Sequence, residues 1–265
     1  MRRLPTYFLS HGGGPWPWLD GPFRRQFDKL EQALAGLPAE LGVKPRAILV
    51  VTGHWEAPQF SVKSGAKPGM IYDYSGFPAH TYSIQYQAPG SPEVAARVKE
   101  LLDAAGIPVA LDPDRGFDHG TFTPLAVMYP EADVPVVQLS VKAGYDPGEH
   151  LAVGRALAPL RDEGVLIVGS GLSWHNLRMM GPAARAPSEA FDGWLHQAME
   201  SEPSRRTRLL ERWDAAPASR LAHPQEDHFI PLLVAVGAAE AEPATRTYHE
   251  RDFMGGVTAS SYRFG

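Results

Sequence analysis

The sequence predicts a single α/β domain in which a central, mostly parallel or mixed sheet is flanked by helices. Short apolar segments, most of them rich in β-branched or aromatic residues, alternate with segments of helical periodicity, as in α/β proteins. Of the 265 residues, 44% are hydrophobic and 21% are charged, a composition typical of a globular protein. No internal repeat or shift in composition divides the chain, so we expect one domain over residues 1–265.

Five segments are expected to form buried strands, because they are apolar and most are bounded by Gly, Ser or Asp. In chain order they are residues 6–10 (TYFLS), 47–52 (AILVVT), 108–111, 134–140 (VPVVQLS) and 165–169 (VLIVG).

Helical spacing of apolar residues separates these strands. One helix has clear boundaries: Ser91 can cap it, Pro92 suits its first turn, and Gly106 ends it. The predicted helices are residues 22–37, 91–105, 146–161, 187–199 and 225–237, and the predicted loops are residues 67–91 and 179–187.

Composition excludes several classes of function. The absence of cysteine rules out a disulfide scaffold, thiolate zinc sites, iron–sulfur clusters and a cysteine nucleophile. The net charge of −5 and the lack of a long basic run argue against nucleic acid as a partner. No apolar stretch approaches the roughly 18 residues of a membrane span, and the first apolar run is too short for a signal peptide. We therefore expect a cytoplasmic protein without a membrane partner.

Three of the ten histidines follow predicted strands in similar contexts: His11, His54 and His175. In open α/β sheets, ligands bind beyond the carboxyl ends of the strands, so these side chains can converge on one pocket. A single histidine in such a place is more often a packing residue. The repeated context favours a shared site.

His119 lies in GFDHGTFTPL and His228 in EDHFIPLL. Taken alone, each could be a turn or first-turn residue with no functional role. Without cysteine, however, a metal would need imidazole or carboxylate ligands, and Glu226 and Asp227 beside His228 could supply a carboxylate. A set of histidines with open coordination positions is typical of a catalytic non-haem metal site. The histidines expected at the surface or in packing are His80, His150, His196 and His249.

Other signals are weaker. No HExxH pattern, P-loop, dinucleotide fingerprint or GxSxG elbow is present, which disfavours the corresponding enzymes. Tryptophans flank three of the histidines, at Trp16, Trp18, Trp55 and Trp174. They are either ordinary core residues or an apolar wall for a flat aromatic ligand.

Six motifs, in order along nearly the whole chain, resemble the DODA-type extradiol ring-opening dioxygenases of the class III, LigB-like superfamily, which includes DOPA 4,5-dioxygenase. The motifs are SHGGGP at 10–15, GHWE at 53–56, GFDHGTFTPL at 116–125, PVVQLS at 135–140, SGLSWHNL at 170–177 and EDHFIPLL at 226–233.

The resemblance implies a LigB-like fold and a role for each histidine. His11, His54 and His228 would bind one non-haem metal, and His175 would be an acid/base group that some members use as a fourth ligand. His119 would contact substrate or bound oxygen. The broader superfamily uses two His and one Glu, whereas this chain has His at the third place. Fe(II) is expected for activity, with Zn(II) as an alternative bound ion. The expected partners are a catechol and O2, and the resemblance leaves a homo-oligomer open.

Two other functions stay open at this stage. The same histidines could hold Zn(II) and activate water, as in a zinc-dependent hydrolase. Alternatively, the chain could be a non-enzymatic LigB-like binding protein, although the complete ligand set argues against it. Residues that select among catechols are expected in loops such as residues 67–86.

Overall fold

The computed structural model describes residues 2–265, which form one mixed sheet of eight strands in the order β4-β3-β5-β2-β6-β1-β8-β7. Its centre consists of four parallel neighbours, β5, β2, β6 and β1. On one side β3 is antiparallel to β5, and on the other β8 is antiparallel to β1. The strands are β1 (Thr6–Ser10), β2 (Ala47–Ala57), β3 (Phe60–Lys63), β4 (Val109–Asp112), β5 (Val136–Lys142), β6 (Val165–Gly171), β7 (Ala244–Phe253) and β8 (Val257–Phe264).

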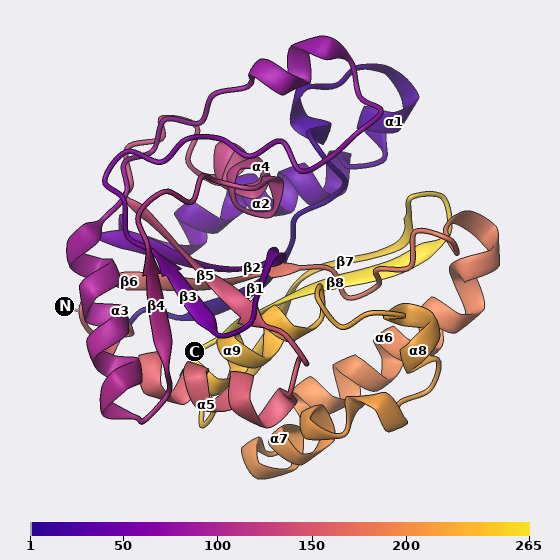
Figure 1. The fold of residues 1–265 in the computed structure, drawn as a ribbon. Coiled ribbons are helices and arrows are strands. Elements are labelled where there is room, and N and C mark those ends of the chain that lie inside the picture. The colour runs from indigo at the N-terminus through magenta and orange to yellow at the C-terminus, as the bar shows by residue number, and fades with distance from the viewer. Residues whose placement is uncertain (1) are drawn as a thin grey trace.

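Helices cover both faces of this sheet (Figure 1). The helices are α1 (Gly21–Arg25), α2 (Asp28–Leu41), α3 (Pro92–Ala104), α4 (His119–Met128), α5 (Pro147–Leu157), α6 (Arg185–Glu200), α7 (Pro203–Glu211), α8 (Ser219–Ala222) and α9 (Ile230–Ala238). In the view of Figure 1, α2 and α4 lie above the sheet, and α5 and α9 lie below it. The architecture confirms the predicted fold class, a single α/β domain with a mixed sheet.

Local sequence explains where the elements begin and which are buried. Ser91 caps α3, since its Oγ accepts a hydrogen bond from the backbone N–H of Val94 at 3.2 Å. Every residue of α9 (IPLLVAVGA) is buried, because this apolar helix packs between α5 and the central strands.

Several predicted boundaries were wrong. The helix expected over 22–37 is two helices, because the backbone leaves helical geometry at Phe27 (φ −107°, ψ 6°). The helix expected over 225–237 begins only at Ile230, so His228 lies in an irregular segment. The strand expected over 47–52 continues to Ala57 and therefore includes His54. The predicted loop at 179–187 contains a short 3-10 helix and the first turn of α6.

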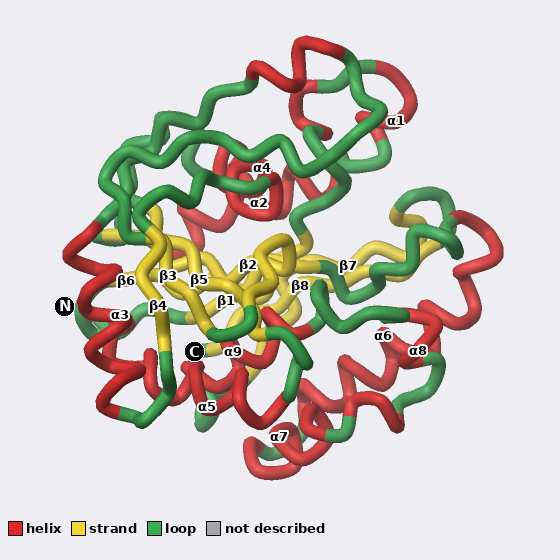
Figure 2. The backbone as a smooth tube through the Cα atoms, in the orientation of Figure 1, coloured by secondary structure: helices red, strands yellow, loops and turns green. Residues whose placement is uncertain are grey.

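Three strands (β3, β7 and β8) and three helices (α4, α7 and α8) have no counterpart among the predicted elements. β7 (ATRTYHERDF) is an edge strand rich in charged residues, so its sequence lacks the apolar character on which the strand predictions relied. β3 and α8 have only four residues each. Figure 2 shows the long connection between β3 and α3, drawn mostly in green as a loop. Within it, the predicted loop of residues 67–91 contains one short 3-10 helix, Ala79–Ser83. Among residues 2–265, no helix combines the length and apolar character that a membrane crossing requires.

Candidate metal centre

Three of the predicted site histidines come together from distant parts of the chain. His11 directly follows β1, His54 lies in the last part of β2, and His228 precedes α9. One ring nitrogen from each lies within 4.8 Å of the other two. His11 and His54 thus meet at the carboxyl ends of parallel strands, as expected from their positions, whereas His175, the third histidine expected there, lies beside His228 and outside this group.

Two glycines allow the segment that carries His228 to lie against the strands. A Cβ atom placed on Gly171 would be 2.0 Å from the carbonyl oxygen of His228, and one on Gly53 would be 2.7 Å from the carbonyl oxygen of Asp227. Real Cβ contacts are essentially never shorter than 3.0 Å. The backbone N–H of Leu172 also donates to the His228 carbonyl at 3.1 Å. Glycine is therefore needed at both positions to bring this imidazole to the strand ends.

The hydrogen bonds of two imidazoles indicate how they are oriented. Nδ1 of His228 lies 2.8 Å from Asp227 Oδ2, and Nδ1 of His54 lies 3.1 Å from Asp73 Oδ2. A carboxylate only accepts hydrogen bonds, so each Nδ1 carries the proton and each Nε2 keeps a free lone pair. These two Nε2 atoms face each other at 3.0 Å.

That separation fits two ligands of one metal ion. Two nitrogens that each lie about 2.1 Å from a metal, at a right angle, are separated by about 3.0 Å. Two lone pairs facing one another repel in the absence of a cation. The donor set and its spacing are therefore those of an imidazole metal site.

His11 completes the group. Both of its ring nitrogens are buried and have no hydrogen-bond partner among the described residues. Unpartnered buried polar atoms are costly, and metal ligation removes that cost. Burial and the neighbouring His54 lower the pKa of His11 well below its ordinary value, and burial does the same to the pKa of His228. Both imidazoles are therefore neutral and can bind a cation.

His119 and His175 lie beside these three residues. His119 is the first residue of α4, and its ring centroid is 3.9 Å from that of His54. The ring of His175 stacks on that of His228 at 3.4 Å between centroids and an 18° interplanar angle. Nitrogen lone pairs lie in the plane of their ring, so two nearly parallel rings stacked 3.4 Å apart hold them in separate planes that one ion cannot share. This geometry favours His175 as a neighbour of the metal site over a fourth ligand. Burial lowers the pKa of His175 to about 3.

The carboxylates near His228 bind other groups. Asp227 Oδ2 contacts the His228 ring, and Glu226 forms an ion pair with Arg220 at 2.5 Å. Burial raises the pKa of Asp227 to about 6. The geometry thus favours imidazole over carboxylate at the third ligand position.

The four histidines expected at the surface or in packing lie outside these groups, and so does His223. His150 is buried, its Nε2 accepts a hydrogen bond from the backbone of Lys142, and its Nδ1 donates to the Asp146 carbonyl. His223 is buried against aromatic rings, with Nε2 3.1 Å from the Ser173 carbonyl. The other three, His80, His196 and His249, are at least partly exposed.

The tryptophans beside the histidines are mainly packing residues. The indole N–H of Trp16 donates to the His11 carbonyl at 2.9 Å, and its ring stacks on Phe27. The indole N–H of Trp174 donates to the Met179 carbonyl. Only Trp18, which is partly exposed and 5.8 Å from the ring of Phe122, remains a candidate for an apolar wall.

Sequence reasoning missed two residues of the predicted loop 67–91. Asp73 contacts both His54 and His119 through its carboxylate, and the ring of Tyr74 lies 5.7 Å from that of His119. Nothing in the local sequence IYDYSGF distinguishes this Asp from any other acidic loop residue. Only the fold brings it to the histidines.

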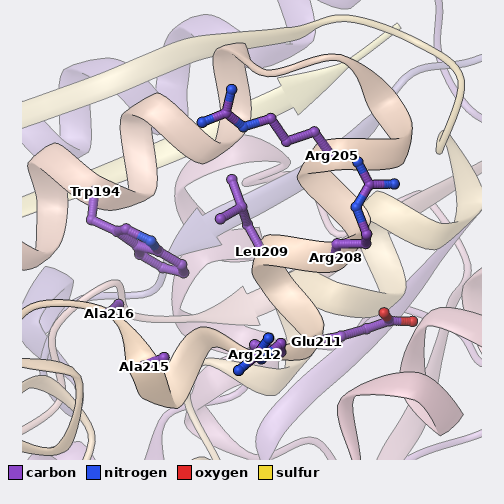
Figure 3. Close-up of a pocket in the computed structure, with 8 residues that line it drawn as sticks. All are labelled: Trp194, Arg205, Arg208, Leu209, Glu211, Arg212, Ala215 and Ala216. Atoms are coloured by element: carbon purple, nitrogen blue, oxygen red, sulfur yellow. The ribbon is translucent and has the colours of Figure 1, made fainter.

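A separate hollow of about 560 Å³ lies between α6, α7 and the short 3-10 helix Trp213–Ala215. Figure 3 shows Trp194 on one side of it and Leu209 with arginine side chains on the other. No histidine lines this hollow, so the metal chemistry is not located there.

Comparisons with known proteins show the family to which the chain belongs. Residues 5–265 match the family described as the catalytic LigB subunit of aromatic ring-opening dioxygenase. A protein of Beta vulgaris named 4,5-DOPA dioxygenase extradiol is 41% identical over 98% of this chain and 96% of its own length. One of the same name from Escherichia coli K12 is 35% identical over 99% of this chain and 95% of its length. The dioxygenase tasH of Hapsidospora irregularis is 38% identical over the whole chain and 86% of its length.

A solved structure shows the same fold. The crystal structure of an uncharacterized protein from Escherichia coli K12 superimposes with a TM-score of 0.80 at 32% identity, covering 99% of this chain and all of the other. The family match spans residues 5–265, a range that contains the five histidines of the proposed site. The chain therefore belongs to the LigB family of aromatic ring-opening dioxygenases.

Proposed function

We propose that this protein opens the ring of a catechol-type substrate with O2 at a metal ion held by His11, His54 and His228. The chain is an extradiol ring-cleaving dioxygenase, as its family and its relatives named 4,5-DOPA dioxygenase extradiol support. The observation that carries the residue assignment is the convergence of three ring nitrogens within 4.8 Å, with two further imidazoles beside them. A zinc-dependent hydrolase and a non-enzymatic binding protein are not favoured by the family.

The ligand set supports Fe(II) as the active metal. Three imidazoles would leave coordination positions of a bound metal open, and Fe(II) held there would supply the redox chemistry that ring opening by O2 requires. Zn(II) binds the same imidazoles well, but it has no redox chemistry. We therefore assign Fe(II) to the active enzyme and Zn(II) to an inactive bound form.

His119 and His175 are proposed to handle protons. Burial lowers the pKa of both imidazoles, so each is uncharged near neutral pH and can accept a proton from a catechol hydroxyl. Nδ1 of His119 donates to Asp73, which leaves its Nε2 free to take that proton. Such general acid–base help typically contributes about 10²–10⁴-fold in rate.

Aromatic side chains border His119. The ring of Tyr74 meets that of His119 edge-on at 5.7 Å, and the ring of Phe122 lies 6.4 Å from that of Tyr74 and 5.8 Å from that of Trp18. A flat catechol ring packs well against such surfaces, which also exclude water. We propose a DOPA-like catechol as the substrate class, since two relatives that match over at least 95% of their own length are named 4,5-DOPA dioxygenase extradiol.

Reconstitution tests the proposal. Metal-free protein is loaded with Fe(II) without air and mixed with a panel of catechols, including DOPA, while O2 uptake and visible absorbance are followed together. We expect O2 uptake with the appearance of a yellow ring-opened product, and neither signal with Zn(II). Absence of O2 uptake across the panel, with Fe(II) bound, would refute the dioxygenase assignment.

A further inference from the structure

Asp73 is the acidic residue that links a proposed metal ligand to a proposed proton acceptor. Its Oδ1 accepts hydrogen bonds from the backbone N–H of His119 at 3.0 Å and from the ring Nδ1 of His119 at 2.8 Å. Its Oδ2 lies 3.1 Å from Nδ1 of His54. One carboxylate therefore contacts three N–H groups of two site histidines.

The segment around Asp73 is itself held in place. The backbone N–H of Ile71 donates to the Phe117 carbonyl at 2.8 Å. The hydroxyl of Tyr72 donates to the Ile84 carbonyl at 2.7 Å, and that of Tyr74 donates to the Thr81 carbonyl at 2.6 Å. Both neighbours of Asp73 are thus anchored, and its carboxylate has a fixed position.

We propose that Asp73 is a positioning residue that fixes the tautomer of His54 so that its Nε2 is free to bind the metal. A neutral imidazole carries one proton, and a carboxylate at Nδ1 holds that proton there because it can only accept. Nε2 of His54, the atom that faces Nε2 of His228 at 3.0 Å, then keeps its lone pair. Carboxylates of this kind raise the basicity of ligating histidines and orient their rings. The inference rests on the proposed function for the assignment of His54 as a ligand.

The substitution Asp73→Asn gives a directional test. An amide has one oxygen, which only accepts, and one NH2 group, which only donates. The oxygen must stay at the Oδ1 position, because the backbone N–H of His119 can only donate. The NH2 group then faces Nδ1 of His54, and that nitrogen must become an acceptor. We expect His54 to change to the Nε2–H tautomer, while His119 keeps its proton on Nδ1.

Asp227 provides a matched control. Its Oδ2 contacts Nδ1 of His228 at 2.8 Å, while its Oδ1 has no hydrogen-bond partner among the described residues. The nearest other imidazole, that of His175, lies 3.8 Å away. Asp227→Asn removes the same charge from the same site, but the amide oxygen can satisfy His228, and the NH2 group at the Oδ1 position stays beyond hydrogen-bond distance of His175. We expect the tautomer of His54 to be unchanged in this variant.

Two measurements decide the proposal. Two-bond ¹H–¹⁵N correlations of ¹⁵N-histidine in metal-free protein report each tautomer. They are recorded at alkaline pH, where His54 is neutral, because burial lowers the pKa of His54 but the hydrogen bond to Asp73 and the charges of nearby carboxylates together outweigh it and leave that pKa raised. Competition with a chelator gives the affinity for Zn(II). In the unmodified protein we expect Nδ1–H at both His54 and His119. In Asp73→Asn we expect Nε2–H at His54 and a Zn(II) affinity lower by about 10–100-fold, the usual effect of losing such a partner.

The proposal is overturned if His54 carries Nε2–H in the unmodified protein, a result that does not depend on whether any variant folds. It is also overturned if Asp73→Asn retains Nδ1–H at His54, or if its Zn(II) affinity stays within about threefold of that of the unmodified protein. The proposal would likewise be refuted if Asp227→Asn lost Zn(II) affinity and showed the same tautomer change at His54. Neither measurement uses a catechol or O2, so failure of the dioxygenase assay and failure of this inference are distinguishable.

Discussion

Gly171, the last residue of β6, is predicted to control the position of the proposed ligand His228. A Cβ atom at this position would lie 2.0 Å from the His228 carbonyl oxygen and 3.0 Å from its carbonyl carbon. β6 itself is paired on both sides, with β1 and with β2, so the strand cannot move away. In Gly171→Ala the segment that carries His228 must therefore move.

The size of that movement follows from the contact. Since Cβ contacts below 3.0 Å essentially never occur, the oxygen has to recede by about 1 Å from its present 2.0 Å. Metal–ligand distances in proteins tolerate only about 0.2 Å, so a shift of this size removes His228 from ligating distance. A misplacement of about 1 Å costs up to about 10²-fold in rate. We expect a loss of metal affinity of at least about tenfold and a fall in kcat/KM of about 10²-fold.

Substitutions at two other glycines serve as controls that distinguish displacement of the ligand from a general loss of stability. Gly154→Ala places a Cβ atom 2.3 Å from the Val234 carbonyl oxygen, where α5 crosses α9. It should cost about 1–3 kcal/mol of overpacking without reaching the site. Gly193→Ala meets no atom within 4 Å and lies in α6, so it should be neutral or stabilising by up to about 1 kcal/mol.

The assay is metal affinity by chelator competition, combined with the free energy of unfolding in urea and with turnover of a catechol. The reasoning is refuted if Gly171→Ala binds metal as tightly as the unmodified protein. It is equally refuted if Gly154→Ala loses as much metal affinity, since general destabilisation would then explain both variants.

Three further predictions concern other histidines. His175→Ala is expected to lower kcat by about 10²–10⁴-fold while metal content, measured by elemental analysis, stays unchanged; loss of the metal would instead identify His175 as a ligand. Metal binding is expected to raise Tm by about 5–10 °C when free metal is about 100-fold above its Kd, and His54→Ala should abolish this shift in a thermal scan. Burial lowers the pKa of His150 to about 4, so between pH 6.5 and 4 the unfolded chain binds the extra proton. Its contribution to stability is therefore complete above pH 6.5 and declines toward pH 4, by about 3 kcal/mol in all. His150→Gln should show a shallower fall of unfolding free energy over that range, and an unchanged slope would contradict the assignment.

The sequence alone was enough to predict the fold class and the family, and it named the histidines of the proposed site. Buried strands are recognisable because short apolar segments bounded by turn residues are a local property of the chain. Histidines placed after such strands meet at one edge of a parallel sheet, so the sequence predicts that His11 and His54 lie close together. The motif GHWE and the five others carried the family resemblance, which the comparisons confirmed.

Local pattern failed where burial and pairing are decided by distant residues. The charged strand β7 forms because its backbone pairs with β8, and its side chains alternate between the protein and the solvent. The helix α9 begins after His228 instead of before it, because the segment is bound to the strand ends through Gly53 and Gly171.

Only the tertiary structure determined which residue forms hydrogen bonds with the site histidines and orients their rings. Asp73 is separated from His119 by 46 residues in the chain, yet the two share hydrogen bonds at 2.8 and 3.0 Å. A ligand can be recognised from its residue type and its strand, whereas the carboxylate that orients it needs only to reach the far side of the ring. That side faces whichever segment the fold packs against it, and no local pattern records the choice. The sequence thus named the atoms that can bind a metal, and the tertiary structure determined which of their nitrogens are free to do so.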